Sequence, residues 1–61
     1  MFVVTKIDEY ICRNGIKIQY WTNGKGFDIV VMQNGFVKST TYTEDQQQAR
    51  EIYQDCCKQF D

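Results

Sequence analysis

Hydrophobic and polar residues alternate in short runs over the first forty positions, and three Asn-Gly pairs separate these runs. Asn-Gly suits the two positive-φ positions of a type I′ turn, the tight turn that closes β-hairpins. The runs themselves are rich in β-branched and aromatic residues, which favour strands. Short connections make successive strands antiparallel neighbours, so we predict a four-stranded meander. Its strands should span residues 2–12, 16–22, 27–33 and 36–42.

The period of the pattern changes after Tyr42, and an amphipathic helix is predicted over 44–60. Thr43 and Gln46 have the spacing of a capping box, in which the threonine hydroxyl accepts from the amide three residues later. The apolar positions that follow lie on one face of a helix. They are Ala49, Ile52, Tyr53, Cys56 and Phe60. This helix should cover one face of the sheet, which gives a single two-layer α+β domain over residues 1–61.

Turn geometry predicts which strand residues face the helix, because a fixed turn fixes the register of a hairpin. We expect two-residue turns at Asn14-Gly15 and Asn34-Gly35, and a turn centred on Gly24-Lys25 between them. These turns pair Ile11 with Ile18, Glu9 with Tyr20, Tyr10 with Gln19, Asp8 with Trp21, Tyr20 with Ile29, Ile18 with Val31, Trp21 with Asp28, Val31 with Lys38, Val30 with Ser39 and Met32 with Val37. Directly opposed residues share a face. The core face then holds Ile7, Ile11, Ile16, Ile18, Tyr20, Phe27, Ile29, Val31, Phe36 and Tyr42.

The opposite face should stay uncovered, because the chain supplies only one helix. It is predicted to carry Lys6, Asp8, Tyr10, Cys12, Lys17, Gln19, Trp21, Asp28, Val30, Met32, Val37, Ser39 and Thr41. Aromatic residues and methionine are enriched at protein interfaces, and an apolar patch rimmed by polar groups often marks one. The candidate partner-binding surface is therefore Tyr10, Lys17, Trp21, Val30, Met32 and Val37. The alternative is that these cross-strand pairs only stabilise an exposed sheet.

The first strand gives a second reason to expect association. Residues 2–6 should extend beyond the end of their partner strand. An unpaired apolar edge is usually covered in proteins, and a second copy of the chain would cover it by strand addition or exchange. A frayed terminus is the other reading of the same feature.

Composition argues against catalysis. The chain has 61 residues, 43% of them apolar and 25% charged, and no histidine. Histidine is the commonest general base and zinc ligand, and Ser39 has no base nearby. Asp8 and Asp28 are expected to flank Trp21, but a flat sheet lacks the cleft that paired carboxylates need for glycoside hydrolysis. We therefore predict no enzyme, no cofactor and no metal site.

Three cysteines, Cys12, Cys56 and Cys57, are an odd number with two adjacent members, which is typical of reduced thiols and not of a disulfide framework. The first residues lack the basic leader and the long apolar run of a signal peptide. No run approaches the roughly 20 apolar residues of a membrane span. We expect a soluble, cytoplasmic protein with no membrane partner.

Nucleic acid is the main alternative partner, because Trp21 and Tyr10 on an open sheet could stack bases of a single strand. Residues 1–42 carry five basic against three acidic side chains, but Asp8 and Asp28 beside Trp21 would repel phosphates. The acidic side chains of the helix could instead meet a basic partner, although a solvated helix face explains them more simply. They are Glu44, Asp45, Glu51, Asp55 and Asp61.

The sequence thus favours a small non-catalytic interaction or regulatory module that binds a protein, either a different chain or a second copy in a homodimer. It implies no small-molecule substrate. Its size would suit an accessory protein of a phage or mobile element.

Overall fold

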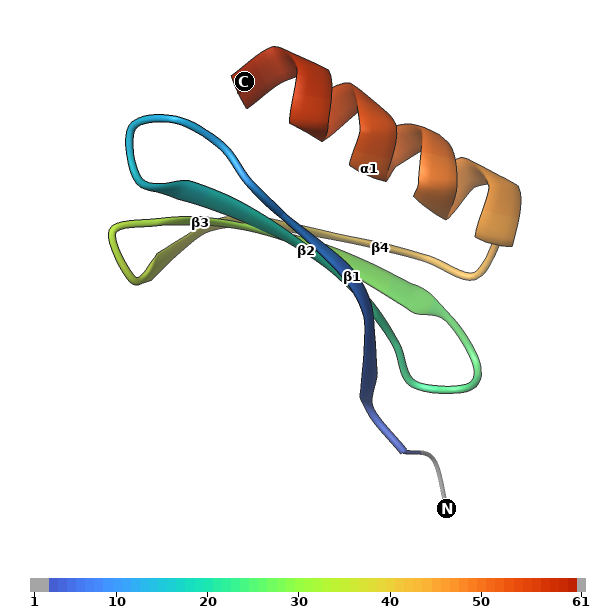
Figure 1. Ribbon diagram of the computed structural model, residues 1–61. Coiled ribbons are helices and arrows are strands. Elements are labelled where there is room, and N and C mark those ends of the chain that lie inside the picture. The colour runs from blue at the N-terminus through green and yellow to red at the C-terminus, as the bar shows by residue number, and fades with distance from the viewer. Residues whose placement is uncertain (1–2, 61) are drawn as a thin grey trace.

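The computed structural model describes residues 3–60 and has two layers, a sheet and one helix (Figure 1). The strands are β1 (Thr5–Ile11), β2 (Ile16–Thr22), β3 (Phe27–Gln33) and β4 (Phe36–Thr43), and the helix is α1 (Gln46–Phe60). The sheet is antiparallel with order β1-β2-β3-β4, and α1 lies across one of its faces. The predicted α+β meander with a C-terminal helix is confirmed.

The central hairpin, β2 and β3, has the predicted register. Tyr20 lies opposite Ile29, Ile18 opposite Val31 and Trp21 opposite Asp28. The side-chain oxygen of Asn23 accepts from the amides of Lys25 and Gly26 at 2.9 and 2.8 Å. This Asx turn closes the loop and leaves Gly24 at a φ of 88°.

The register of β1 against β2 differs from the prediction by one residue. The Asn14-Gly15 pair does have positive φ at both positions, 63° and 75°. However, the amide that donates to the Ile16 carbonyl belongs to Cys12, at 2.8 Å, so the loop contains a third residue, Arg13. Tyr10 therefore lies opposite Ile18, and Ile11 opposite Lys17. Since side chains alternate with period two, this slip moves residues 8–11 of β1 to the faces opposite to those predicted.

A bulge in β1 changes the register once more. Lys6 lies opposite Trp21 but Asp8 lies opposite Tyr20, which leaves Ile7 as the extra residue. The predicted pairing of Asp8 with Trp21 is wrong because of the one-residue slip, and the bulge places Lys6 opposite Trp21 instead. Thr5 still pairs with Thr22, so the apolar overhang within the described residues shrinks to Val3 and Val4. The predicted strand start at residue 2 lies outside the described residues.

The register of β4 begins as predicted and then shifts. The turn at Asn34-Gly35 sets Met32 opposite Val37, as expected. Lys38 is then the extra residue of a bulge, so Ser39 lies opposite Val31 and Thr41 opposite Ile29. The predicted pairs Val31–Lys38 and Val30–Ser39 are wrong for this reason. Ser39 and Thr41 consequently share the helix side, and Tyr42, opposite Asp28, faces away from it.

The core is narrower than the predicted core face. It is made of β2, β3, the residue after β1 and one helix position, namely Cys12, Ile16, Ile18, Tyr20, Ile29, Val31 and Ala49. Partly buried side chains, mostly from α1, pack around it: Phe27, Ile52, Tyr53, Cys56, Cys57 and Phe60. Ile7, Ile11, Phe36 and Tyr42 were expected here but are exposed. Phe36 does share a face with Gln33, yet it is 77% exposed beside the last turn of the sheet.

The helix begins two residues later than predicted, and Asp45 caps it. One carboxylate oxygen of Asp45 accepts from the amides of Gln47 and Gln48 at 2.9 and 3.2 Å. Thr43 is thus not the cap. Its hydroxyl accepts from the Asp45 amide and donates to the Gln48 side chain, at 3.2 and 2.9 Å. Within residues 3–60, no helix has the length and apolar character needed to cross a membrane.

Candidate interaction surface

We call the side of the sheet away from α1 the open face. Pairing places twelve residues on it, three from each strand: Lys6, Glu9, Ile11, Lys17, Gln19, Trp21, Asp28, Val30, Met32, Val37, Thr40 and Tyr42. Five of the six predicted site residues are brought together here: Lys17, Trp21, Val30, Met32 and Val37. The sixth, Tyr10, lies on the helix side opposite the fully buried Ile18, because of the slip in β1.

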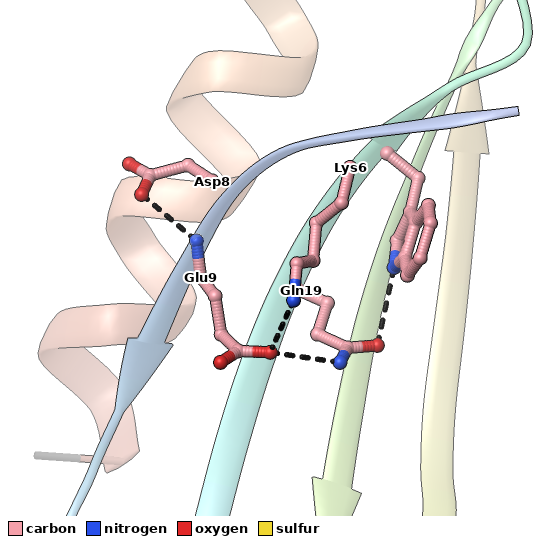
Figure 2. Close-up of polar contacts among 5 residues, drawn as sticks. Lys6, Asp8, Glu9 and Gln19 are labelled. Atoms are coloured by element: carbon pink, nitrogen blue, oxygen red, sulfur yellow. Dashed lines mark hydrogen bonds and ion pairs between the residues drawn. The ribbon is translucent and has the colours of Figure 1, made fainter.

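A chain of polar contacts crosses the part of the open face formed by β1 and β2 (Figure 2). Lys6 Nζ lies 3.1 Å from a Glu9 carboxylate oxygen, and the Gln19 side-chain amide donates to the same oxygen at 2.9 Å. The Trp21 indole N–H then donates to the Gln19 carbonyl oxygen at 3.1 Å. Lys6 Nζ also lies 6.0 Å from the centre of the Trp21 ring. These contacts hold the orientation of Trp21 from two sides.

The charge on Glu9 is favoured by this arrangement. The hydrogen bond from Gln19, followed by the one from Lys6, lowers the pKa of Glu9 below its ordinary value. Glu9 therefore remains a carboxylate acceptor at neutral pH and keeps the chain of contacts intact. Glu9 belongs to this surface although the predicted register placed it on the core face.

The part of the open face formed by β3 and β4 is mostly apolar. Val30 and Met32 are half-buried, Val37 is 62% exposed, and Tyr42 is also exposed. The Tyr42 ring lies over Gly26, where any larger residue would collide with it. We call Val30, Met32, Val37 and Tyr42 the apolar half of the open face. Asp28, opposite both Trp21 and Tyr42, carries the one charge in these two strands on this face.

The predicted pair of carboxylates beside Trp21 does not exist. Asp28 lies opposite Trp21 as expected, but the residue on the other side is Lys6. The one-residue slip in the loop turns Asp8 toward the helix, and the bulge at Ile7 brings Lys6 opposite Trp21. The environment of Trp21 is therefore one acid and one base. The open face as a whole carries Lys6 and Lys17 against Glu9 and Asp28, which balance.

Both outer strands of the sheet are irregular. β1 has its bulge at Ile7 and β4 at Lys38. Bulges and edge lysines disfavour pairing with a further strand. The edges are consequently poorer docking sites than the open face.

The cysteines lie on the helix side, near one end of the core. Cys12 is buried, and Cys56 and Cys57 pack against the same core cluster. None of the three forms a disulfide. Burial raises the pKa of both Cys56 and Cys57, so these thiols stay protonated and weakly nucleophilic at neutral pH. In the described part of the chain, no three cysteine or acidic side chains converge on a possible metal site.

Four residues of the open face were not predicted there: Glu9, Ile11, Thr40 and Tyr42. The predicted pairings assigned Glu9, Ile11 and Tyr42 to the core face. All four lie on the open face because a loop or bulge adds one residue to an outer strand. A composition pattern cannot signal such an insertion, since Ile7 and Ile11 have the spacing of a buried strand whichever face they occupy.

The chain was also compared with known proteins. No protein-family model, no curated protein and no solved structure matches it.

Proposed function

We propose that this chain is a small non-catalytic protein-interaction or regulatory module that binds a protein partner through the open face. One observation carries the proposal: the apolar half lies beside an oriented tryptophan, and no described element covers it. Tryptophan at the centre of a mixed patch is typical of interaction hot spots. The polar contacts of β1 and β2 would form the rim on one side.

The charges of the open face favour a second copy as the first partner to test. Two lysines and two acids can be satisfied by the same set on another molecule, as a two-fold interface requires. A partner surface of one charge sign would face either the two lysines or the two acids of the open face with a like charge. Because both sheet edges carry bulges, the second copy would dock face to face and not by strand addition.

Light scattering as a function of concentration tests this proposal. The wild-type chain should show the mass of a dimer, and Trp21→Ala combined with Met32→Ser should show that of a monomer with an unchanged circular dichroism spectrum. Phe36→Ser removes a more exposed apolar side chain outside the open face and should leave the dimer intact. A double variant that still dimerises would exclude the open face.

If the wild-type chain is a monomer throughout, a different protein takes the place of the second copy. The same variants then serve in a pull-down with immobilised wild-type chain. A partner that the double variant retains as well as the wild type would again exclude this surface.

Binding of single-stranded nucleic acid is the second candidate function. It gains from one observation, that Lys6 and not Asp8 lies across from Trp21. A second observation argues against this function, because Tyr10, the other expected stacking residue, is on the helix side. Trp21 fluorescence should be quenched by an oligonucleotide at low salt and should recover as salt rises. Unchanged fluorescence at low salt would exclude this function.

We also propose a cytoplasmic location, supported by three cysteines that form no disulfide, as is usual in a reducing compartment. Cell fractionation with a tagged chain tests it. An accessory role in a phage or mobile element rests on chain length alone.

A further inference from the structure

The helix side of the sheet contains a pocket that the sequence did not suggest. The helix α1 packs against β3, β2 and β4, and β1 lies beyond its edge. The three-residue loop before β2 sets Asp8 opposite Tyr20 and so turns it toward the space that this leaves. The result is an open pocket of about 370 Å³ between β1 and the first half of α1. Its size is at the lower end of the range of roughly 300–1,000 Å³ that is typical of small-ligand sites.

Two tyrosines supply the aromatic part of the pocket. Tyr20 is almost fully buried, and its ring lies 5.4 Å from that of Tyr53, centre to centre. Burial, and then the nearby carboxylate of Asp8, raise the pKa of Tyr53 above its ordinary value. Tyr53 therefore stays neutral and keeps its hydroxyl proton as a donor. The exposed part of the Tyr53 ring, with the buried Tyr20 ring behind it, offers a surface for an aromatic or apolar group.

Two opposite charges line the same pocket without pairing with each other. Asp8 comes from β1 and Arg50 from α1, while the one ion pair within residues 3–60 is Lys6–Glu9. Both side chains are exposed. Gln46 and Gln54 add amide groups that donate and accept.

This combination selects the class of ligand. A simple cation would be attracted by Asp8 and repelled by Arg50. A simple anion would be attracted by Arg50 and repelled by Asp8. A neutral zwitterion satisfies both groups at once, with its ammonium at Asp8 and its carboxylate at Arg50. We infer that this pocket binds a free α-amino acid with an aromatic or large apolar side chain, which would lie against Tyr20 and Tyr53.

Phenylalanine and two blocked analogues test the inference by calorimetry and by backbone amide shifts. N-acetylphenylalanine lacks the ammonium and phenylalanine amide lacks the carboxylate. Each should bind about tenfold or more weakly than phenylalanine, because each loses a charge-assisted hydrogen bond. The shifts should concentrate at Asp8, Tyr20, Tyr53 and Gln54.

Variants assign each contact to a residue. Asp8→Asn should abolish the difference between phenylalanine and its N-acetyl form, and Arg50→Gln the difference between phenylalanine and its amide. Asp28→Asn and Arg13→Gln make the same charge changes outside the pocket and should preserve both differences.

Three results would overturn the inference. They are no saturable binding of phenylalanine up to about 10 mM, equal binding of the blocked analogues, and shifts confined to the open face. Because the pocket and the open face lie on opposite sides of the sheet, the Trp21 and Met32 variants should bind phenylalanine normally. Failure of the proposed interaction surface is thus distinguishable from failure of this site.

Discussion

The two sides of this sheet are stabilised by different kinds of contact. On the helix side, Ile18, Ile29 and Val31 are buried almost completely under α1, and Tyr20 stacks with Phe27 and Tyr53. On the open face, polar groups are bridged in sequence from Lys6 to Trp21, and the apolar half stays in contact with solvent. The helix side is organised by burial, which is non-directional, and the open face by directional bonds. Stability should therefore depend on the first side and recognition on the second.

The largest effect should come from a cavity on the helix side. Ile18→Ala should lower the free energy of unfolding by about 2–5 kcal/mol. A domain of this length has roughly 3–9 kcal/mol in total, so this variant should be close to unfolding. Val37→Ala on the open face should cost less than about 1 kcal/mol. Urea denaturation measures both, and Ile18→Val keeps the comparison accessible if the alanine variant does not fold. Equal losses at the two positions would contradict the difference between the two sides.

A smaller effect should distinguish neighbouring residues of β1. Tyr10 lies on the helix side and is 36% exposed, whereas Ile11 lies on the open face and is 69% exposed. Tyr10→Thr should cost about 1 kcal/mol through lost burial, and Ile11→Thr about 0.5 kcal/mol or less. Threonine suits a strand at either position, so the difference between the two stability losses shows which residue faces the helix. If thermal denaturation showed a larger loss for Ile11→Thr than for Tyr10→Thr, it would support the register of a two-residue turn instead.

The smallest effect concerns pH and is specific to the open face. The pKa of Glu9 is lowered in the folded protein, so Glu9 binds its proton less readily than in the unfolded chain. Its contribution to stability is therefore present above the ordinary value of 4.5 and is lost as the pH falls through the folded value. A carbon-detected NMR titration should show the lowered pKa, and Gln19→Ala should raise it. No change in that variant would mean that the bond from Gln19 does not act on Glu9.

The central hairpin could be predicted in detail because its turn residues and its alternation agree. Asn23 closes the loop by its own side chain, and the register that this turn sets places Ile18, Tyr20, Ile29 and Val31 on one face. The register of the outer strands could not be predicted in the same way. Tyr10 and Ile11 are both plausible core residues, and one extra residue in the loop decides which of them faces the helix. The same limit hid the pocket, whose Asp8 carboxylate reaches the helix side because the loop before β2 has that extra residue. The side of the sheet that forms the open face did follow from the sequence, but half of the residues on that face belong to the outer strands.

The nearest-neighbour order of the strands also bears on how the chain reaches this fold. Each pairing joins segments separated by a short loop, so the entropy lost on closing that loop is small. Topologies with such local pairings fold faster than those with distant partners. The β2–β3 hairpin combines the most regular pairing with the most deeply buried side chains, which makes it the natural folding nucleus. Substitutions in it should slow folding, while those in the bulged outer strands should chiefly accelerate unfolding, a separation that stopped-flow kinetics can measure.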